Sequence, residues 1–220
     1  RARMGCVRLQ VRILYSRLRS AVIQNLLGCR RPEYFMSHSP WETLSSKVIY
    51  QNKWMRFYED KVIRPDGNEG IYSYLSKEVG VFVLARSHEN HFYFIREYRY
   101  PVKNHVIQVP GGGVGHRSDL SAAKQELLEE TGLIANRWHS LGRFYIGPGH
   151  EDLIAHSFLA TDITNENEAN FSHQEGNESI ERIIKLSLPQ VRKYISTGKI
   201  NCGITLATWN LYQNSKFYSN

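Results

Sequence analysis

Three glutamates fall close together on one predicted helix, and their spacing suggests a site for a hard metal ion. Residues 119–131 are predicted to be helical, which places Glu126, Glu129 and Glu130 at i, i+3 and i+4 on one face. Carboxylates packed in this way repel one another, and a divalent cation placed among them removes that repulsion. Because no histidine or cysteine joins the cluster at helical spacing, the oxygen ligands favour Mg²⁺, with Mn²⁺ as the alternative.

The segment before the helix supplies backbone that a ligand can approach closely. Gly111, Gly112 and Gly113 precede the helix, and glycine has no Cβ to block an incoming group. A glycine loop, a helix N-terminus and a carboxylate-bound cation together describe a site for a diphosphate. The alternative is that the three glutamates form an ordinary solvated helix face. If only the helix is considered, this alternative is favoured, because runs of charged residues are usually solvated surface.

The ends and the core-facing side of this helix can also be predicted. Ser118 is a suitable N-cap residue, and Gly132 supplies a left-handed stop. One stripe of the helix is predicted to face the core, and it consists of Leu120, Ala123, Leu127 and Thr131.

The elements around the helix indicate a mixed α/β protein with a sheet flanked by helices. Residues rich in β-branched and aromatic types, with a Pro-Asp-Gly-Asn turn, predict a small antiparallel sheet within 41–76. Further strands are predicted at 79–85, 92–98, 106–109, 141–146, 154–160 and 180–186. Two helices, 188–197 and 203–213, follow them.

The positive charge is concentrated at the start of the chain. The 220 residues carry 28 Lys and Arg against 21 Asp and Glu, a formal net charge of +7. Residues 1–35 hold eight arginines and one glutamate, so this leader accounts for the whole excess. No apolar run of the leader approaches the ~20 residues of a membrane span. We therefore expect neither a nucleic-acid nor a membrane partner.

The leader also bears on the compartment. Residues 1–35 resemble a transit peptide, but the favoured interpretation is upstream or expression-derived sequence ahead of Met36. Only Cys202 lies outside the leader, so a disulfide framework is not expected and a reducing compartment is. We expect a cytoplasmic protein, or an organellar one if the leader is a genuine transit peptide.

Residues 111–133 resemble the Nudix box, Gly-x5-Glu-x7-Arg-Glu-U-x-Glu-Glu-x-Gly-U, where U is aliphatic. When the box starts at its first glycine, the matching positions are Gly111, Glu126, Leu127, Glu129, Glu130, Gly132 and Leu133. Two positions depart from the pattern, because Arg117 stands where glutamate is expected and Gln125 where arginine is expected. The alternative is that Gly112 begins the box and the loop is one residue shorter.

The resemblance covers roughly 41–213 and is to the ADP-ribose pyrophosphatase (ADP-sugar diphosphatase) branch of that family. The other motifs that carry it are Asn52-Lys53-Trp54, Pro65-Asp66-Gly67, Glu97-Tyr98-Arg99-Tyr100-Pro101, Trp138, Pro148-Gly149 and His156-Ser157-Phe158-Leu159-Ala160. It implies a Nudix α/β/α sandwich with a mixed sheet, plus a small N-terminal antiparallel sheet through which two copies form a homodimer. The implied domains are an N-terminal sheet and dimerisation segment, 36–76, and a Nudix hydrolase domain, 77–220.

The resemblance also implies the metal ligands. Glu126 and Glu130 would be the primary ligands of Mg²⁺, with Glu129 assisting and the carbonyl of Gly111 completing the protein's share. Water would then attack one phosphorus of the diphosphate.

Two glutamates have implied catalytic roles. They are Glu129 and Glu178. Glu178 is the implied general base because the run Asn177-Glu178-Ser179-Ile180, just before a predicted strand, resembles the segment of the family at that place. Glu175 and Glu181 in the same segment are the alternatives for the base.

The implied substrate-binding residues are Arg99, Gly112, Gly113 and Trp54. For Arg99, which resembles an arginine that engages the phosphates or ribose, the alternative is a structural ion pair with an acid of the sheet. For Trp54, which could stack on a nucleobase, the alternative is a place in the core of the sheet or dimer.

The implied function is Mg²⁺-dependent hydrolysis of the diphosphate bond of ADP-ribose or a related nucleoside diphosphate sugar. The products would be AMP, or the corresponding nucleoside monophosphate, and a sugar phosphate. The alternative is a catalytically weak or inactive Nudix domain that binds nucleotide sugars as a sensor. That alternative depends on Arg117, Gln125 and Gln108, which stand where the branch has glutamate, arginine and glutamate respectively.

Overall fold

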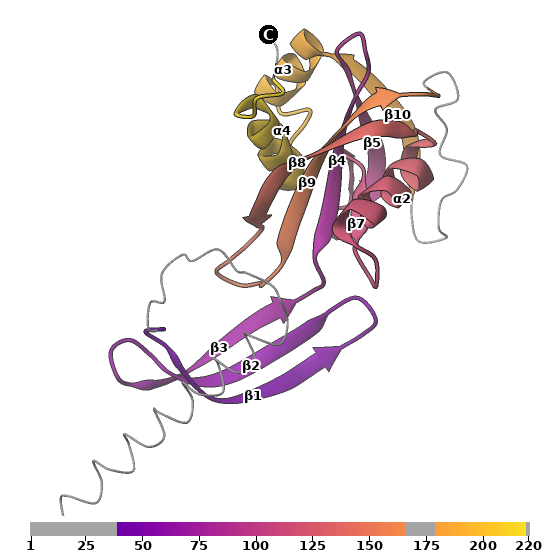
Figure 1. Cartoon of the computed structure of the whole chain (residues 1–220). Helices are drawn as coiled ribbons and strands as arrows, with labels where there is room; N and C mark the ends of the chain where they lie inside the picture. The colour runs from indigo at the N-terminus through magenta and orange to yellow at the C-terminus, as the bar shows by residue number, and fades with distance from the viewer. Residues whose placement is uncertain (1–38, 166–178, 219–220) are drawn as a thin grey trace, which may run out of the picture. The chain divides into compact units, whose positions relative to one another are not determined.

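The computed structural model describes residues 39–165 and 179–218, and the fold is given for these residues. The chain divides into two units after Trp41, and the second unit is Glu42–Asn220. Every helix and strand described below lies in the second unit, which Figure 1 shows as a small sheet and a larger sheet with helices against it.

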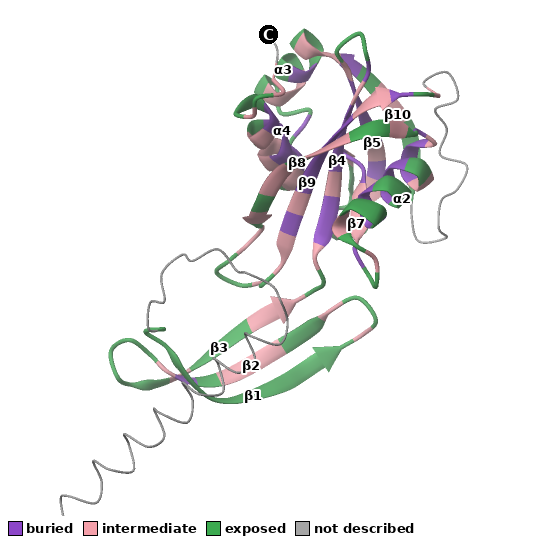
Figure 2. Cartoon of the chain, viewed as in Figure 1, coloured by how far each residue is buried: buried purple, intermediate pink, exposed green. Residues whose placement is uncertain are grey.

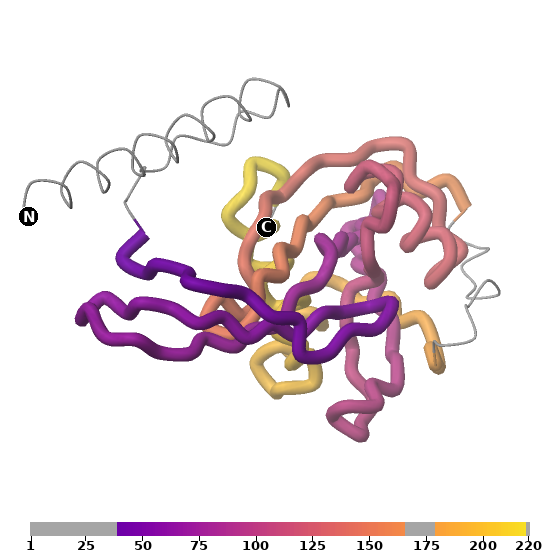
Figure 3. Tube along the Cα trace, turned by 90° about the horizontal axis from the view of Figure 1, so that it is seen from below, coloured from indigo at the N-terminus to yellow at the C-terminus, as the bar shows by residue number. Residues whose placement is uncertain are grey.

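A small antiparallel sheet forms from the first strands, as predicted. These strands are β1 (Glu42–Gln51), β2 (Arg56–Ile63) and β3 (Glu69–Ser76), paired in the order β1-β2-β3. Figure 3 shows them running side by side. The β2–β3 turn has the expected chemistry, because Gly67 adopts a φ of +82° and Asp66 accepts a hydrogen bond from Asn68 N at 3.0 Å.

The larger sheet has mixed pairing, as the resemblance implies. Its main path runs β10-β5-β4-β9-β8, with β6 paired to β5 and β7 paired to β4. Strands β4 and β9 are parallel, and the other pairs are antiparallel. The strands are β4 (Gly80–Arg86), β5 (His91–Arg99), β6 (Asn104–Gln108), β7 (Gly111–Gly113), β8 (Ala135–Tyr145), β9 (Ile154–Ile163) and β10 (Ile180–Ser187).

Helices cover both faces of the larger sheet, which confirms the α/β/α sandwich. They are α2 (Asp119–Thr131), α3 (Leu188–Ser196) and α4 (Gly203–Gln213). Side chains of β4 alternate between two cores, with Val81 and Val83 packed under α2 and Leu84 in the core of α3 and α4. Figure 1 shows α2 on one side of the sheet and the other two helices on the opposite side. Among the described residues, no helix is long and apolar enough to cross a bilayer.

Two segments differ from the prediction. The glycine run, expected to be a loop, is the short strand β7, whose missing side chains give no alternating pattern to read. Strand β8 begins at Ala135 rather than at residue 141. A bulge between Ser140 and Gly142 shifts the pairing with β9 there, and it interrupts the alternation that marks a strand.

Candidate active site

The helix that carries the glutamates begins and ends where the sequence predicts. Ser118 caps α2 by accepting a hydrogen bond from Ser121 N at 3.3 Å, and Gly132 ends the helix with a φ of +68°. The buried residues are Ala122, Ala123, Glu126, Leu127, Glu130 and Thr131. The predicted core position of Leu120 is wrong, because this side chain is 39% exposed and the helix turns two glutamates toward the sheet instead.

Glu126 and Glu130 lie against the glycine strand. Only 8% of Glu126 and 2% of Glu130 is exposed to solvent. Glu130 Oε2 accepts a hydrogen bond from Gly111 N at 2.8 Å. The Glu126 carboxylate lies close to Gly112, where an added Cβ would come within 2.6 Å of Oε2. The absence of a side chain at Gly112 therefore lets this carboxylate approach the backbone.

Glu129 is oriented by its neighbour on the helix. Its carboxylate is half-buried, and Gln125 Nε2 donates a hydrogen bond to Oε1 at 2.6 Å. The side chain that replaces the arginine of the Nudix box thus keeps a contact with a glutamate, and this contact is a neutral hydrogen bond rather than an ion pair.

Arg117 places a positive charge beside Glu126. Its Nη2 lies 3.4 Å from Glu126 Oε1 and donates to Gly113 O at 2.8 Å. Its Nε donates to Val114 O at 3.1 Å, so two backbone carbonyls hold the guanidinium in place. The residue that departs from the box is therefore part of the same cluster as the helix carboxylates.

The donor chemistry of this cluster fits a hard divalent cation. Buried carboxylates need a compensating charge or several donors, and oxygen ligands suit Mg²⁺. Glu126, Glu130 and the backbone of Gly111 are the groups that would hold such an ion. Within the described residues, no three Asp, Glu, His or Cys side chains already converge on one point. Glu129, the assisting ligand in the prediction, accepts a hydrogen bond from Gln125.

Glu78 belongs to the same region and was missed from the sequence. Its Oε2 accepts a hydrogen bond from Gly115 N at 2.7 Å, and a Cβ added at Gly113 would come within 2.1 Å of Oε1. Glu78 lies in the connection between β3 and β4, far from the box in sequence. No local motif marks it, and only the pairing of β4 with β7 brings it to the glycine strand.

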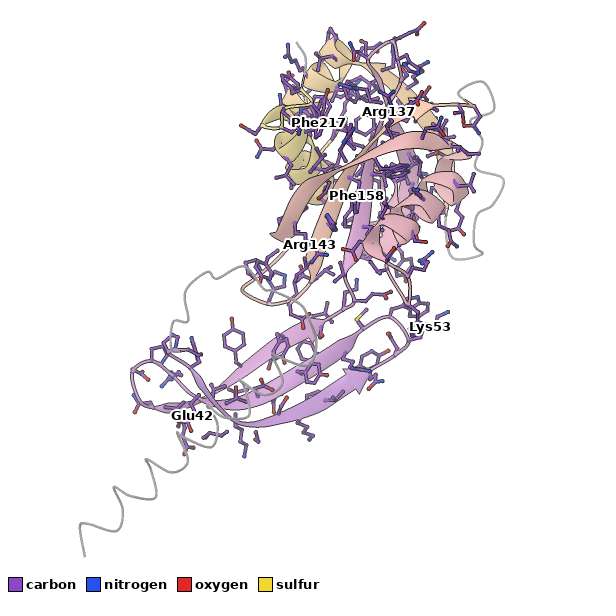
Figure 4. The ribbon with its side chains drawn as sticks, viewed as in Figure 1. Glu42, Lys53, Arg137, Arg143, Phe158 and Phe217 are labelled. Atoms are coloured by element: carbon purple, nitrogen blue, oxygen red, sulfur yellow. The ribbon has the colours of Figure 1, made fainter. Side chains whose placement is uncertain are left out.

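A polar cluster fixes the start of α2. Asp119 Oδ2 accepts hydrogen bonds from Arg143 Nη2 at 2.6 Å and from His156 Nδ1 at 2.7 Å, while His156 Nε2 lies 2.8 Å from Ser140 Oγ. Burial raises the pKa of Asp119, but the contacts with His156 and Arg143 outweigh burial and leave this pKa below its ordinary value. Figure 4 labels Arg143 on β8. The cluster ties the helix to β8 and β9 and so holds its glutamates over β7.

Arg99 forms the ion pair that was the alternative to a substrate contact. Its Nη2 lies 3.0 Å from Glu97 Oε2, and its Nε donates to Gln108 Oε1 at 3.2 Å. Gln108 Nε2 donates to the same Glu97 oxygen at 2.9 Å. Burial raises the pKa of Glu97, and Arg99 opposes this shift. The amide at 108 serves both partners, whereas a second carboxylate there would face Glu97. The Arg99 side chain remains 44% exposed.

The other predicted residues belong to other elements or fall outside the described residues. Trp54 is 58% exposed in the segment between β1 and β2, with Lys53 Nζ 4.4 Å from the centre of its ring. Glu175 and Glu178 are outside the described residues. Glu181 on β10 pairs with Arg96 and with His105, which is 3.4 Å away.

Two family models match successive parts of the chain. The nucleoside diphosphate sugar hydrolase N-terminal domain matches residues 41–75, which include β1, β2 and most of β3. The NUDIX domain matches residues 75–195, which include the glycine strand, α2 and the main sheet.

Three individual proteins are also similar to this chain in sequence or in fold. The ADP-ribose pyrophosphatase of Bacillus subtilis (strain 168) is 28% identical over 125 residues, which are 56% of this chain and 67% of that protein. The methanol dehydrogenase activator of Bacillus methanolicus is 27% identical over 161 residues, which are 72% of this chain and 85% of that protein. A crystal structure of an ADP compounds hydrolase has the same fold, with a TM-score of 0.69 at 16% identity, over 81% of this chain and 95% of that one.

Proposed function

Because the chain belongs to the NUDIX domain family, whose members generally use divalent metals, we propose that it is a Mg²⁺-dependent diphosphate hydrolase. The proposed substrate is ADP-ribose or a related nucleoside diphosphate sugar, and the products are AMP, or another nucleoside monophosphate, and a sugar phosphate. The matching N-terminal model and the similarity to an ADP-ribose pyrophosphatase support this substrate class. Mn²⁺ is the alternative cation.

The observation that carries the proposal is the pair of buried glutamates of α2 that lie against the glycine strand. Glu126 and Glu130 are nine-tenths buried or more, an expensive state for carboxylates that a bound divalent cation would offset together with the contacts from Arg117 and Gly111 N. When bound, a divalent cation lowers the pKa of water and stabilises charge on the phosphates. Glu130 is fixed by Gly111 N, and the cluster at Asp119 fixes the start of the helix. The chain thus holds its proposed ligands in place.

The catalytic and substrate-binding roles are proposed from the resemblance to the family. Glu129, oriented by Gln125, and Glu178 are the proposed catalytic residues, with Glu178 taking the proton of the attacking water. Substrate contacts are proposed for the backbone of Gly112 and Gly113 and for Arg99 and Trp54, whose side chains are exposed enough to meet a ligand. The proposed divisions of the chain are the basic leader, 1–35, and the two domains that the resemblance implies, 36–76 and 77–220.

An assay of the full chain tests the proposal against the sensor alternative. The protein is incubated with ADP-ribose and Mg²⁺, and AMP is quantified by chromatography alongside a panel of nucleoside diphosphate sugars. We expect release of AMP that stops when EDTA removes the metal. Measurable nucleotide binding without turnover of any sugar in the panel would favour the sensor, which Arg117, Gln125 and Gln108 motivate.

We further propose that the small N-terminal sheet joins two copies of the chain. Every residue of β1 is exposed, and within β1, β2 and β3 only Val62 is buried. Figure 2 shows the exposed colour over most of these strands. The exposed apolar residues are Leu44, Val48, Ile49, Tyr50, Phe57, Ile71 and Tyr72. A sheet of three strands needs a second layer for stability, and a second copy would supply it.

Ile71→Asp should convert the dimer into a monomer. Ile71 is 65% exposed on β3, and an aspartate there would bury a charge in the proposed interface. The matched control is Ile134→Asp, because Ile134 is also exposed, at 49%, and lies between α2 and β8. Light scattering after size-exclusion chromatography measures the mass. A monomeric wild type, or a dimer that both variants leave intact, would contradict the proposed interface.

A further inference from the structure

Arg117 is held as a fixed part of the site rather than as a free surface side chain. Its guanidinium is bonded to the carbonyls of Gly113 and Val114, at 2.8 and 3.1 Å, and its side chain is only 30% exposed. These bonds leave the charged group facing the Glu126 carboxylate, with Nη2 3.4 Å from Oε1. Neither glutamine nor lysine could replace it, because glutamine has no charge and lysine has no planar group to bond both carbonyls.

This fixed charge changes what Glu126 has to offer a metal. Oε1 already faces a cation, and both carboxylate oxygens lie close to Gly112, where an added Cβ would come within 2.6 Å of Oε2 and 2.8 Å of Oε1. A partly buried pair at this distance is favourable, so a divalent ion at Oε1 has to displace or share the contact with Arg117. The arginine therefore neutralises part of the Glu126 charge without any metal ion.

The guanidinium also keeps donors available for a substrate. Nε and Nη2 are used by Gly113, Val114 and Glu126, whereas Nη1 makes no hydrogen bond with the described residues. Phosphate oxygens are the acceptors that a guanidinium fork matches best. A diphosphate lying over β7 would meet these donors directly.

We propose that Arg117 takes the place of one divalent cation in this site: it neutralises Glu126 and donates directly to the diphosphate of the substrate. The inference rests on the proposed function, because it assumes that a nucleoside diphosphate lies over β7. It predicts that the protein retains affinity for a diphosphate without metal, and that metal and Arg117 compete at Glu126.

Binding measurements on metal-free protein test the inference. Calorimetry with EDTA present gives the affinity for ADP-ribose, and calorimetry without EDTA gives the affinity for Mn²⁺ alone. Arg117→Gln should weaken metal-free ADP-ribose binding by about tenfold or more, as expected for lost bonds to a charged group. It should also tighten Mn²⁺ binding by about threefold or more, because the competing charge is gone.

Two further variants make the test specific. Arg137→Gln is the control for charge, because Arg137 is 75% exposed on β8 and pairs only loosely with Asp162, at 3.8 Å. It should change neither affinity. Arg117→Lys keeps the charge but loses the planar fork, so metal-free ADP-ribose binding should weaken while Mn²⁺ affinity stays near the wild-type value. This variant also provides the test if Arg117→Gln does not fold.

The outcomes separate this inference from the proposed function. Unchanged metal-free ADP-ribose affinity in both Arg117 variants, or weaker Mn²⁺ binding in Arg117→Gln, would overturn the role of Arg117. The opposite outcome is a wild-type protein whose metal-free binding of ADP-ribose depends on Arg117 but which does not hydrolyse ADP-ribose. That outcome would contradict the proposed hydrolase activity and leave the inference standing.

Discussion

Replacing Glu126 or Glu130 with glutamine should lower kcat for ADP-ribose hydrolysis by about a hundredfold or more while leaving the fold intact. Glutamine has nearly the same shape as glutamate but lacks the charge that a divalent cation requires. At Glu130 the amide oxygen can still accept the hydrogen bond from Gly111 N, so the contact between α2 and β7 is preserved. Steady-state kinetics with saturating Mg²⁺ measures the loss, and thermal unfolding checks the fold.

The matched control is Glu89→Gln, which removes the same charge from a residue outside the helix and the glycine strand. Glu89 lies between β4 and β5, its side chain is 76% exposed, and its contact with His91 is a loose 3.7 Å. We expect wild-type kinetics from this variant. Full activity in Glu126→Gln or Glu130→Gln would remove that carboxylate from the site, even if the chain proved to be a hydrolase.

The signals that allowed the helix to be predicted are local ones. Ser118 and Gly132 act within a few residues of themselves, and both form the predicted cap and stop. The spacing of the glutamates follows from helical geometry alone. How the helix is rotated, however, is decided by packing against β7 and by the Asp119 cluster, so Leu120 could not be placed correctly from periodicity.

Contacts between distant segments explain what the sequence did not reveal. Glu78 reaches the glycine strand only because β4 pairs with β7, and no sequence motif near Glu78 predicts that pairing. For Arg99 the sequence permits either a substrate contact or an ion pair with an acid of the sheet. The structure contains the ion pair, because Glu97 is buried beside Arg99. The sequence marks Arg117 as a departure from the box, but its bonds to two carbonyls depend on the three-dimensional path of the loop.

Alanine at Gly111 and alanine at Gly112 should have different consequences, although the two positions are adjacent. At Gly111 the new Cβ would lie 2.2 Å from Val81 O, a backbone atom of β4. Because backbone cannot swing away, the β4–β7 pairing must give, and we expect a loss of about 1–3 kcal/mol in the free energy of unfolding. Denaturant unfolding of the metal-free protein measures this loss.

At Gly112 the new Cβ would instead meet the Glu126 carboxylate, at 2.6 Å from Oε2. A side chain can rotate away, so we expect a loss of stability below about 1 kcal/mol but a loss of Mn²⁺ affinity and of kcat of about tenfold or more. Gly203→Ala is the control, since no atom lies within 4 Å of its added Cβ. If Gly112→Ala lost stability like Gly111→Ala and kept its metal affinity, the close approach of Glu126 to β7 would be a packing contact. If instead Gly111→Ala loses mainly stability and Gly112→Ala loses mainly metal affinity, the two glycines have different roles. Gly111 is then needed for the pairing of the sheet, and Gly112 for the carboxylate that binds the ion.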